Sequence, residues 1–181
     1  DLSALSGILA YEPEEFTFTA CAGTPVAEID KILARQKQYL PFDPPLASAG
    51  ATLGGTVASG LSGSGRYLYG GVRDFVLGVG FVDGEGRLVR AGGRVVKNSA
   101  GFDLPKLMVG SLGSLGAIVE LTFKVFPRPA GYLTLQAECA DIETALKRMD
   151  SAASSHLDIA ALDLTAESEG YCLWVRMGGY P

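Results

Sequence analysis

A stretch of small residues between positions 50 and 65, GATLGGTVASGLSGSG, is the part of the chain best suited to binding a ligand. Six of its sixteen residues are glycine, and none is charged or aromatic. Small residues let a backbone pack against a large planar or phosphorylated ligand, and a short helix starting near Gly55 would direct free N–H groups at an anion. The alternative is a flexible linker, but Leu53, Val57 and Leu61 recur at one helical turn, which favours an ordered element.

Two common phosphate-binding motifs do not match this stretch. A P-loop needs G-x-x-x-x-G-K-[ST], and no segment of the chain fits it. A dinucleotide fingerprint needs G-x-G-x-x-G between a strand and a helix; Gly63 and Gly65 match its first two glycines, but Leu68 stands at the third. The remaining interpretation is a glycine-rich turn whose own backbone packs against the ligand.

Side chains for catalysis or metal binding are sparse. The one histidine, His156, lies in a polar stretch and is expected to be a solvated residue near a helix end. The cysteines, Cys21, Cys139 and Cys172, form no C-x-x-C pair, which argues against zinc, iron–sulfur and disulfide frameworks. We therefore assign no catalytic acid or base and predict no metal site.

The composition is that of a globular protein without a nucleic-acid partner. The 181 residues carry a formal net charge of -5, so the basic surface of a nucleic-acid binder is missing. Residues 44–65 are uncharged, but their strongly apolar side chains are too few for insertion into a bilayer. We expect a cytoplasmic protein that inserts directly into no membrane.

Strand and helix patterns alternate irregularly over the first 129 residues. Alternating large and small residues predict a strand over 16–23, and an amphipathic helix follows over 24–36, with Thr24 as N-cap and Pro25 at its first position. The segment 74–93 predicts a hairpin around an Asp-Gly-Glu-Gly turn. The helix face expected to be buried consists of Val26, Ile29 and Leu33.

The remaining elements complete an α+β pattern. Asp103 is expected to cap a short helix, and a strand should run over 117–126. From residue 130 glycine becomes rarer; a strand over 132–139, a helix over 141–155 and two further strands are predicted. We expect this helix to bury Ile142, Ala145, Leu146 and Met149. The absence of regular βαβ alternation favours α+β over a doubly wound sheet.

Four blocks in this order and spacing resemble the FAD-binding domain of the vanillyl-alcohol oxidase / p-cresol methylhydroxylase superfamily. The blocks are PPLASAGATLGGTVASG, YGGVRDFVLG, VDGEGRLVRAGG and KNSAGFDLPKLMVGSLGSLGAI. Within the superfamily the chain is most similar to the FAD-binding subunits of bacterial glycolate oxidases. The resemblance implies that residues 1–129 form the second subdomain of the FAD-binding domain. Residues 130–181 would then be the start of a small α+β cap domain.

The resemblance also implies which residues contact FAD. The segment P-x(6)-[AST]-T-x-G-G matches positions 45–55, the next segment matches 58–62, and the block G-S-x-G-[ST]-L-G-x-[IL] matches 110–118. Leu112 stands where many members carry Glu, so any role of that carboxylate is absent. The implied contacts are Pro45, Leu46, Ala51, Thr52, Gly54, Gly55, Ser59, Gly60, Ser62, Gly113, Gly116 and Ile118.

One departure from the superfamily concerns the pyrophosphate. Members have an N-terminal βαβ unit whose glycine-rich loop holds it, whereas this chain begins at Asp1, inside the segment that normally follows that unit. The C-terminal region resembles only the start of the cap domain. We therefore expect a chain truncated at both ends, in which half of the pyrophosphate site is missing.

The implied function is that of an FAD-binding subunit of a 2-hydroxy acid oxidase or dehydrogenase of the glycolate oxidase type. Its expected partners are a larger flavoprotein subunit, an iron–sulfur subunit and a small 2-hydroxy acid, with any membrane association made through those partners. The alternatives are a cofactor-free assembly subunit, a D-lactate dehydrogenase-like flavoprotein and a plain nucleotide-binding module.

Overall fold

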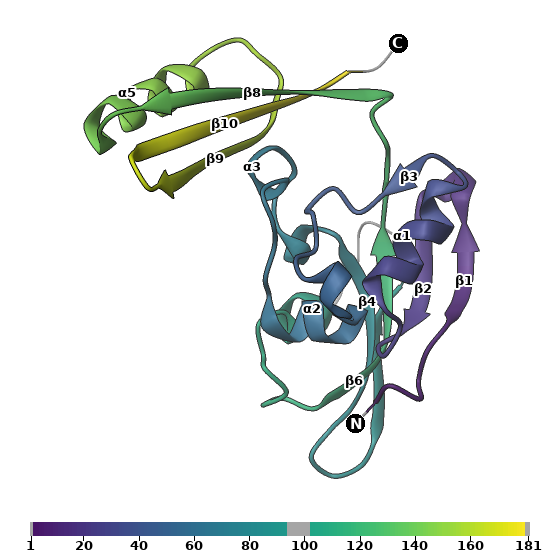
Figure 1. Ribbon diagram of the computed structural model, residues 1–181. Helices are drawn as coiled ribbons and strands as arrows, with labels where there is room; N and C mark the ends of the chain where they lie inside the picture. Colours follow the sequence, from purple (N-terminus) through teal and green to yellow (C-terminus); the bar gives the residue numbers. More distant parts are fainter. Residues whose placement is uncertain (1, 94–101, 180–181) are drawn as a thin grey trace. The chain divides into compact units, whose positions relative to one another are not determined.

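The computed structural model describes residues 2–93 and 102–179, which fall into two compact units (Figure 1). The first comprises Asp1–Gly63 and Gly70–Arg128, and the second comprises Ser64–Tyr69 and Pro129–Pro181. Residues 97–101, which belong to one of the blocks that carry the resemblance, lie outside the described residues. Each unit is treated separately below.

A five-stranded antiparallel sheet forms the first unit, in the order β1-β2-β6-β4-β5. Its core includes Phe18 on β2 and Phe123 on β6, whose rings stack at 5.9 Å between centroids, with Phe42 stacked on Phe123 at 6.0 Å. The hairpin β4–β5 and the strand β6 were predicted from sequence and are confirmed. The strands are β1 Ile8–Glu12, β2 Thr17–Cys21, β4 Val76–Val82, β5 Leu88–Gly92 and β6 Ala117–Lys124.

Short helices accompany this sheet. The predicted burial of one face of α1 is confirmed, because Val26, Ile29 and Leu33 are all buried. The predicted cap of α4 is also confirmed, since the Asp103 carboxylate accepts a hydrogen bond from the Lys106 N–H at 3.2 Å. The helices are α1 Val26–Ala34, α2 Leu53–Ser59 and α4 Leu104–Met108, with 3-10 turns η1 Pro13–Glu15, η2 Ala47–Ala49 and η3 Val72–Asp74; β3 Gln38–Tyr39 pairs with β7 Phe126–Pro127.

Two local predictions in this unit are wrong. Pro25, not Thr24, is the N-cap of α1, because the Thr24 hydroxyl is engaged with Gly7 and Cys21 instead of the helix. Leu61 lies beyond the end of α2 and is 53% exposed, because the chain leaves the helix at Gly60 with a left-handed φ of 69°. Of the three residues that recur at one helical turn, only Leu53 and Val57 therefore lie in α2 and are buried.

The second unit is a three-stranded antiparallel sheet in the order β8-β10-β9, packed with α5. Its core consists of Ile159, Leu162, Leu173 and Val175, against which Met149 of α5 packs. The predicted order of strand, helix and two strands is confirmed. The elements are α3 Arg66–Tyr69, β8 Gly131–Cys139, α5 Ile142–Ala153, β9 Ile159–Glu167 and β10 Gly170–Gly179.

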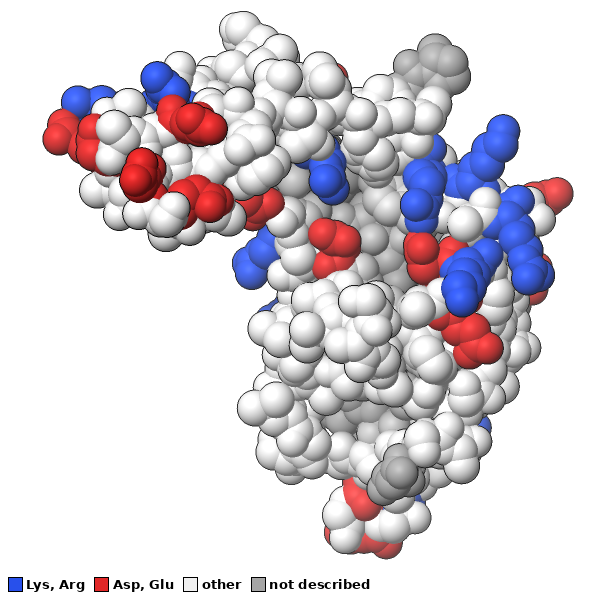
Figure 2. All heavy atoms as spheres, in the orientation of Figure 1, with Lys and Arg blue, Asp and Glu red and all other residues white. Residues whose placement is uncertain are grey.

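The predicted buried face of α5 is only partly correct. Ala145 is fully buried, but Ile142 and Leu146 are 43% and 52% exposed. Leu146 lies about 100° around the helix from Ala145, on its flank. Ile142 lies within about 20° of Met149, so its exposure reflects its place as the first residue of α5 and not its face. Charged side chains gather over α5 in the view of Figure 2, where Lys147 pairs with Glu143 at 2.8 Å.

Asp141 provides a test of how α5 is anchored. Its carboxylate accepts a hydrogen bond from the Thr144 N–H at 2.8 Å, which lowers the pKa of Asp141 below its ordinary value. A group with a lowered folded-state pKa stabilises the fold above its unfolded pKa, and this stabilisation is lost as the pH falls through the folded value. Asp141→Ala should therefore lower the thermal midpoint by more at pH 7 than at about pH 3, because the stabilisation decreases once the pH falls below the unfolded-state pKa of about 3.9.

Circular dichroism on heating, at both pH values, measures this difference. Asp158→Ala is the control, because it removes the same charge from an exposed residue that does not cap α5. An equal loss at pH 7 in both variants would contradict the role of the cap.

Candidate functional site

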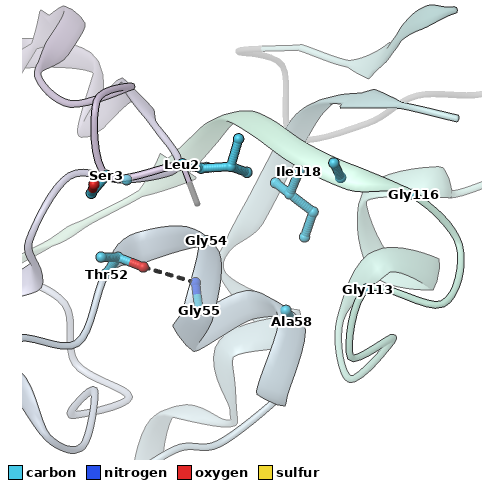
Figure 3. Close-up of a pocket in the computed structure, with 12 residues that line it drawn as sticks. Leu2, Ser3, Thr52, Gly54, Gly55, Ala58, Gly113, Gly116 and Ile118 are labelled. Carbon is cyan, nitrogen blue, oxygen red and sulfur yellow. Dashed lines mark hydrogen bonds between the residues drawn. The ribbon is translucent and has the colours of Figure 1, made fainter. Parts of the chain in front are cut away.

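A cavity of about 300 Å³ opens in the first unit beside the N-terminal half of α2 (Figure 3). Ligand sites in proteins span about 300–1,000 Å³, so the cavity has room for part of a cofactor-sized ligand. Three segments supply its walls: the start of the chain with the end of β2, the helix α2, and the loop that leads into β6. The lining residues are Leu2, Ser3, Ala22, Gly23, Thr52, Gly54, Gly55, Ala58, Gly113, Gly116, Ala117 and Ile118.

The first turn of α2 is fixed by contacts with β2 and with its own cap. The Thr52 hydroxyl accepts a hydrogen bond from the Gly55 N–H at 3.2 Å, as drawn in Figure 3. The Leu53 N–H donates to the Thr24 carbonyl at 2.9 Å, and the Gly54 N–H donates to the Ala22 carbonyl at 2.7 Å. The prediction of free N–H groups at this helix start is therefore wrong, because strand carbonyls and the cap already occupy them.

Gly54 allows α2 to lie directly on the end of β2. A Cβ at this position would be 2.7 Å from the Ala22 Cβ and 3.0 Å from the Ala22 carbonyl oxygen. Real Cβ atoms do not approach that closely, so any side chain would push the helix away from the strand. Glycine at position 54 thus sets the distance between two walls of the cavity.

The N-terminal segment lies equally close to Gly23. A Cβ at Gly23 would be 2.2 Å from the Leu2 carbonyl oxygen and 2.7 Å from that of Leu5. The Gly23 N–H donates to the Leu5 carbonyl at 2.9 Å, and the Cys21 N–H donates to the Gly7 carbonyl at 3.0 Å. These contacts hold the first residues of the chain against the end of β2.

The loop before β6 is attached to the C-terminal end of α2. The Gly110 and Leu112 N–H groups donate to the Val57 and Ala58 carbonyls, each at 2.9 Å. Gly116 has a φ of 148°, and a Cβ there would be 2.6 Å from the Val82 carbonyl oxygen. The loop therefore passes close to both β4 and α2, and its backbone closes the third side of the cavity.

Six of the twelve residues predicted to contact FAD line this cavity: Thr52, Gly54, Gly55, Gly113, Gly116 and Ile118. The other six do not line it. Leu46 is 65% exposed with a left-handed φ of 62°, and the Ala51 carbonyl accepts a hydrogen bond from the Val26 N–H at 2.9 Å. Pro45 is half-buried and precedes that exposed leucine.

The last three of these residues belong to the end of α2 and the turn after it. The Ser59 hydroxyl donates to the Thr56 carbonyl at 3.1 Å, and Gly60 ends α2. The Ser62 hydroxyl accepts a hydrogen bond from the Val72 N–H at 2.9 Å, so it fixes the start of η3.

Sequence reasoning missed the other half of the lining. Ala22 and Gly23 are the last two residues of the strand predicted over 16–23, and Ala58 lies one helical turn after Gly54, so the sequence carried only a weak signal that they lie near the glycine-rich stretch. No local pattern indicates Leu2 and Ser3, since these residues join the cavity only through tertiary contacts.

The cavity is lined by backbone and small or apolar side chains and contains no ionisable group. None of its twelve lining residues is ionisable, and the surface over α2 carries no charged side chain in the view of Figure 2. Among the described residues there is no group of three or more His, Cys, Asp or Glu side chains that could hold a metal ion. The site is therefore suited to enclosing a ligand that brings its own chemistry.

The search for membrane-spanning helices is limited to the same part of the chain. Over residues 2–93 and 102–179, no helix is both long and apolar enough to cross a bilayer.

The fold and the cavity together define the class of protein. The chain superposes on two structures of alkyldihydroxyacetonephosphate synthase, with TM-scores of 0.78 and 0.80 at 20% identity, over 97% and 99% of this chain and 37% and 38% of the other. This likeness confirms the predicted α+β fold. The family described as the FAD binding domain matches residues 1–92. The chain belongs to this family, whose cofactor is FAD.

Curated relatives narrow the comparison. The glycolate oxidase subunit GlcE of Escherichia coli (strain K12) is 41% identical over 179 residues, which are 99% of this chain and 50% of that protein. A D-lactate dehydrogenase of Anaerostipes hadrus is 33% identical over 90% of the chain, and the glycolate oxidase subunit GlcD of Bacillus subtilis (strain 168) is 32% identical over 88%. The chain spans half the length of the first relative and about a third of the other two, 34% each.

The residues of the cavity fit part of FAD. Eight of the twelve are glycine or alanine, which let a flat ring or a diphosphate approach the backbone closely. The lining contains no carboxylate that would repel the phosphates. Because FAD is larger than a cavity of about 300 Å³, the residues present can enclose only a portion of it.

Gly54→Ala tests the close approach of α2 and β2. The new methyl group would overlap the Ala22 Cβ, so we expect a loss of about 1–3 kcal/mol in the free energy of unfolding, measured in urea. Gly55→Ala is the control in the same helix, because its Cβ would meet only the Thr52 hydroxyl, at 3.2 Å. The control should stay within about 1 kcal/mol of the unsubstituted chain. Equal losses in both variants would contradict the steric explanation.

Proposed function

We propose that this chain is the FAD-binding part of a flavin-dependent 2-hydroxy acid oxidoreductase subunit of the glycolate oxidase type. The observation that carries the proposal is the cavity at the start of α2, which the glycine-rich stretch and the loop before β6 line with small residues. The relative that is similar over 99% of the chain is a glycolate oxidase subunit. When bound, the flavin supplies the acceptor for a hydride from the α-carbon of the hydroxy acid.

The chain's own residues would bind and orient the cofactor. The proposed contacts within the cavity are the backbone of Gly54, Gly55, Gly113 and Gly116, with Thr52 and Ile118 at its sides. Six predicted contacts lie outside the cavity, and we propose that they contact the part of FAD that extends beyond it. These residues are Pro45, Leu46, Ala51, Ser59, Gly60 and Ser62. None of these side chains is ionisable, so the acid or base of the reaction must come from elsewhere.

We further propose how the chain is organised and with what it assembles. Residues 1–129 would carry the flavin site, and residues 130–181 would be part of a cap domain that contacts the substrate. Two relatives are named as subunits of glycolate oxidases, which supports assembly into a multi-subunit complex. The expected partners are a larger flavoprotein subunit and an iron–sulfur subunit, and association with the inner membrane would be made through them.

A D-lactate dehydrogenase-like flavoprotein is the second candidate, favoured by the 33% identity to the Anaerostipes hadrus enzyme. Anaerobic reduction of the bound flavin distinguishes the two. Under our proposal glycolate should bleach the flavin absorbance of the assembled complex faster than D-lactate, and the reverse order would support the second candidate.

Flavin binding is the primary test of the proposed function. Titration of the chain with FAD should quench the flavin fluorescence and saturate at one FAD per chain. Ala58→Phe should raise the Kd by at least about tenfold, because the ring would fill the cavity against α2. Ala153→Phe, which makes the same change at an exposed residue of α5, should leave the Kd unchanged.

Failure of the unsubstituted chain to bind FAD would contradict the proposal. If such a chain still captured the partner subunits, it would support the alternative of a cofactor-free assembly subunit.

A further inference from the structure

A buried hydroxyl is one of the groups that connect the N-terminal wall of the cavity to the rest of the first unit, beside the backbone hydrogen bonds of Cys21 and Gly23. Thr24 is 1% exposed, and its Oγ1 accepts a hydrogen bond from the Gly7 N–H at 2.9 Å. The same oxygen lies 2.7 Å from the Cys21 carbonyl and 3.2 Å from the Gly7 carbonyl, the two acceptors within reach of its proton. The hydroxyl therefore binds both polar groups of Gly7 and the end of β2.

Thr24 also contacts the opposite wall through its backbone. Its carbonyl oxygen accepts the hydrogen bond from the Leu53 N–H at 2.9 Å, which places the first turn of α2. The N-terminal segment and α2 face each other across the cavity, with Leu2 and Thr52 among the lining residues (Figure 3). Thr24 is thus hydrogen-bonded to both walls, through its hydroxyl to Gly7 and through its carbonyl to Leu53.

We propose that Thr24 is a positioning residue of the flavin cavity: its hydroxyl holds residues 2–7 in place as the wall against which FAD binds. This inference rests on the proposed flavin site. Thr24 does not line the cavity and touches no ligand there, so its effect on FAD would pass through Leu2 and Ser3.

The chemistry of the side chain specifies which substitutions matter. The Gly7 N–H needs an acceptor, which the Thr24 hydroxyl supplies, whereas the Gly7 carbonyl also accepts a hydrogen bond from the Cys21 N–H at 3.0 Å. Valine has the shape of threonine without the hydroxyl, so it would leave the Gly7 N–H without its partner. Serine keeps the hydroxyl and loses only a methyl group, so it should restore the wall.

Thr19→Val is a matched control from the same strand region. The Thr19 and Thr122 hydroxyls share a buried hydrogen bond of 2.9 Å between β2 and β6. Thr19→Val removes this buried hydrogen bond from the sheet but changes no contact of the N-terminal segment. A purely structural role of Thr24 would therefore make the two valine variants behave alike.

The first measurement is amide hydrogen exchange of the chain without FAD. In Thr24→Val the Leu5 and Gly7 amides, which donate hydrogen bonds to the Leu2 carbonyl and the Thr24 hydroxyl, should exchange at least about tenfold faster than in Thr19→Val, since the Gly7 anchor is lost. Thr24→Ser should match the unsubstituted chain. Equal exchange in both valine variants would overturn the proposal that this hydroxyl holds the segment.

The second measurement is the Kd for FAD by fluorescence quenching. Thr24→Val should raise it by about tenfold relative to Thr19→Val, with Thr24→Ser within about twofold of the unsubstituted chain. Faster exchange with an unchanged Kd would overturn the link between the segment and the flavin. If Thr24→Val does not fold, Thr24→Cys, whose thiol is a weak donor and acceptor, should show the same changes at smaller size.

Lack of FAD binding by the unsubstituted chain would contradict the proposed function and, with it, the role of Thr24 toward the flavin. The exchange measurement would still decide whether Thr24 holds residues 2–7.

Discussion

The first unit depends on a close approach of three segments at Ala22, Gly23 and Thr24. The N-terminal segment and α2 both pack on these residues with no space for a Cβ at Gly23 or Gly54. The backbone hydrogen bonds that join them satisfy the first N–H groups of α2 with strand carbonyls, so the helix start needs no ligand to be stable. The cavity lies between the N-terminal segment and α2, whose separation is fixed by their contacts with Ala22, Gly23 and Thr24.

The glycines around the cavity are needed for specific steric and conformational reasons, and do not make this part of the chain a flexible linker. Gly23, Gly54 and Gly116 are required because their neighbours would collide with a Cβ. Gly113, in contrast, has open space around the position of its Cβ, and its φ of 79° favours glycine for conformational reasons. The cavity is therefore lined both by glycines that set distances between elements and by glycines that shape a loop.

The elements that could be predicted from the sequence are those whose signals are local. The β4–β5 hairpin has its turn residues in sequence, and the spacing of Leu53 and Val57 indicates the short helix α2, so both were found. The cap of α1 was missed because the Thr24 hydroxyl is used in a tertiary contact instead. Half of the cavity lining is implied by the family resemblance, whereas Leu2 and Ser3 join the cavity only through tertiary contacts, which no local sequence pattern indicates.

The contact between Gly54 and Ala22 has a consequence for how this family can vary. The two positions share the volume of about one methyl group, since a Cβ at 54 would stand 2.7 Å from the Ala22 Cβ. A homologue with alanine at the position of Gly54 would need glycine at the position of Ala22 and also a small shift of α2, because the new Cβ would still lie 3.0 Å from the carbonyl oxygen of residue 22. Substitutions at these two sites should therefore appear together across homologous sequences, as compensating pairs in evolution and not as independent changes.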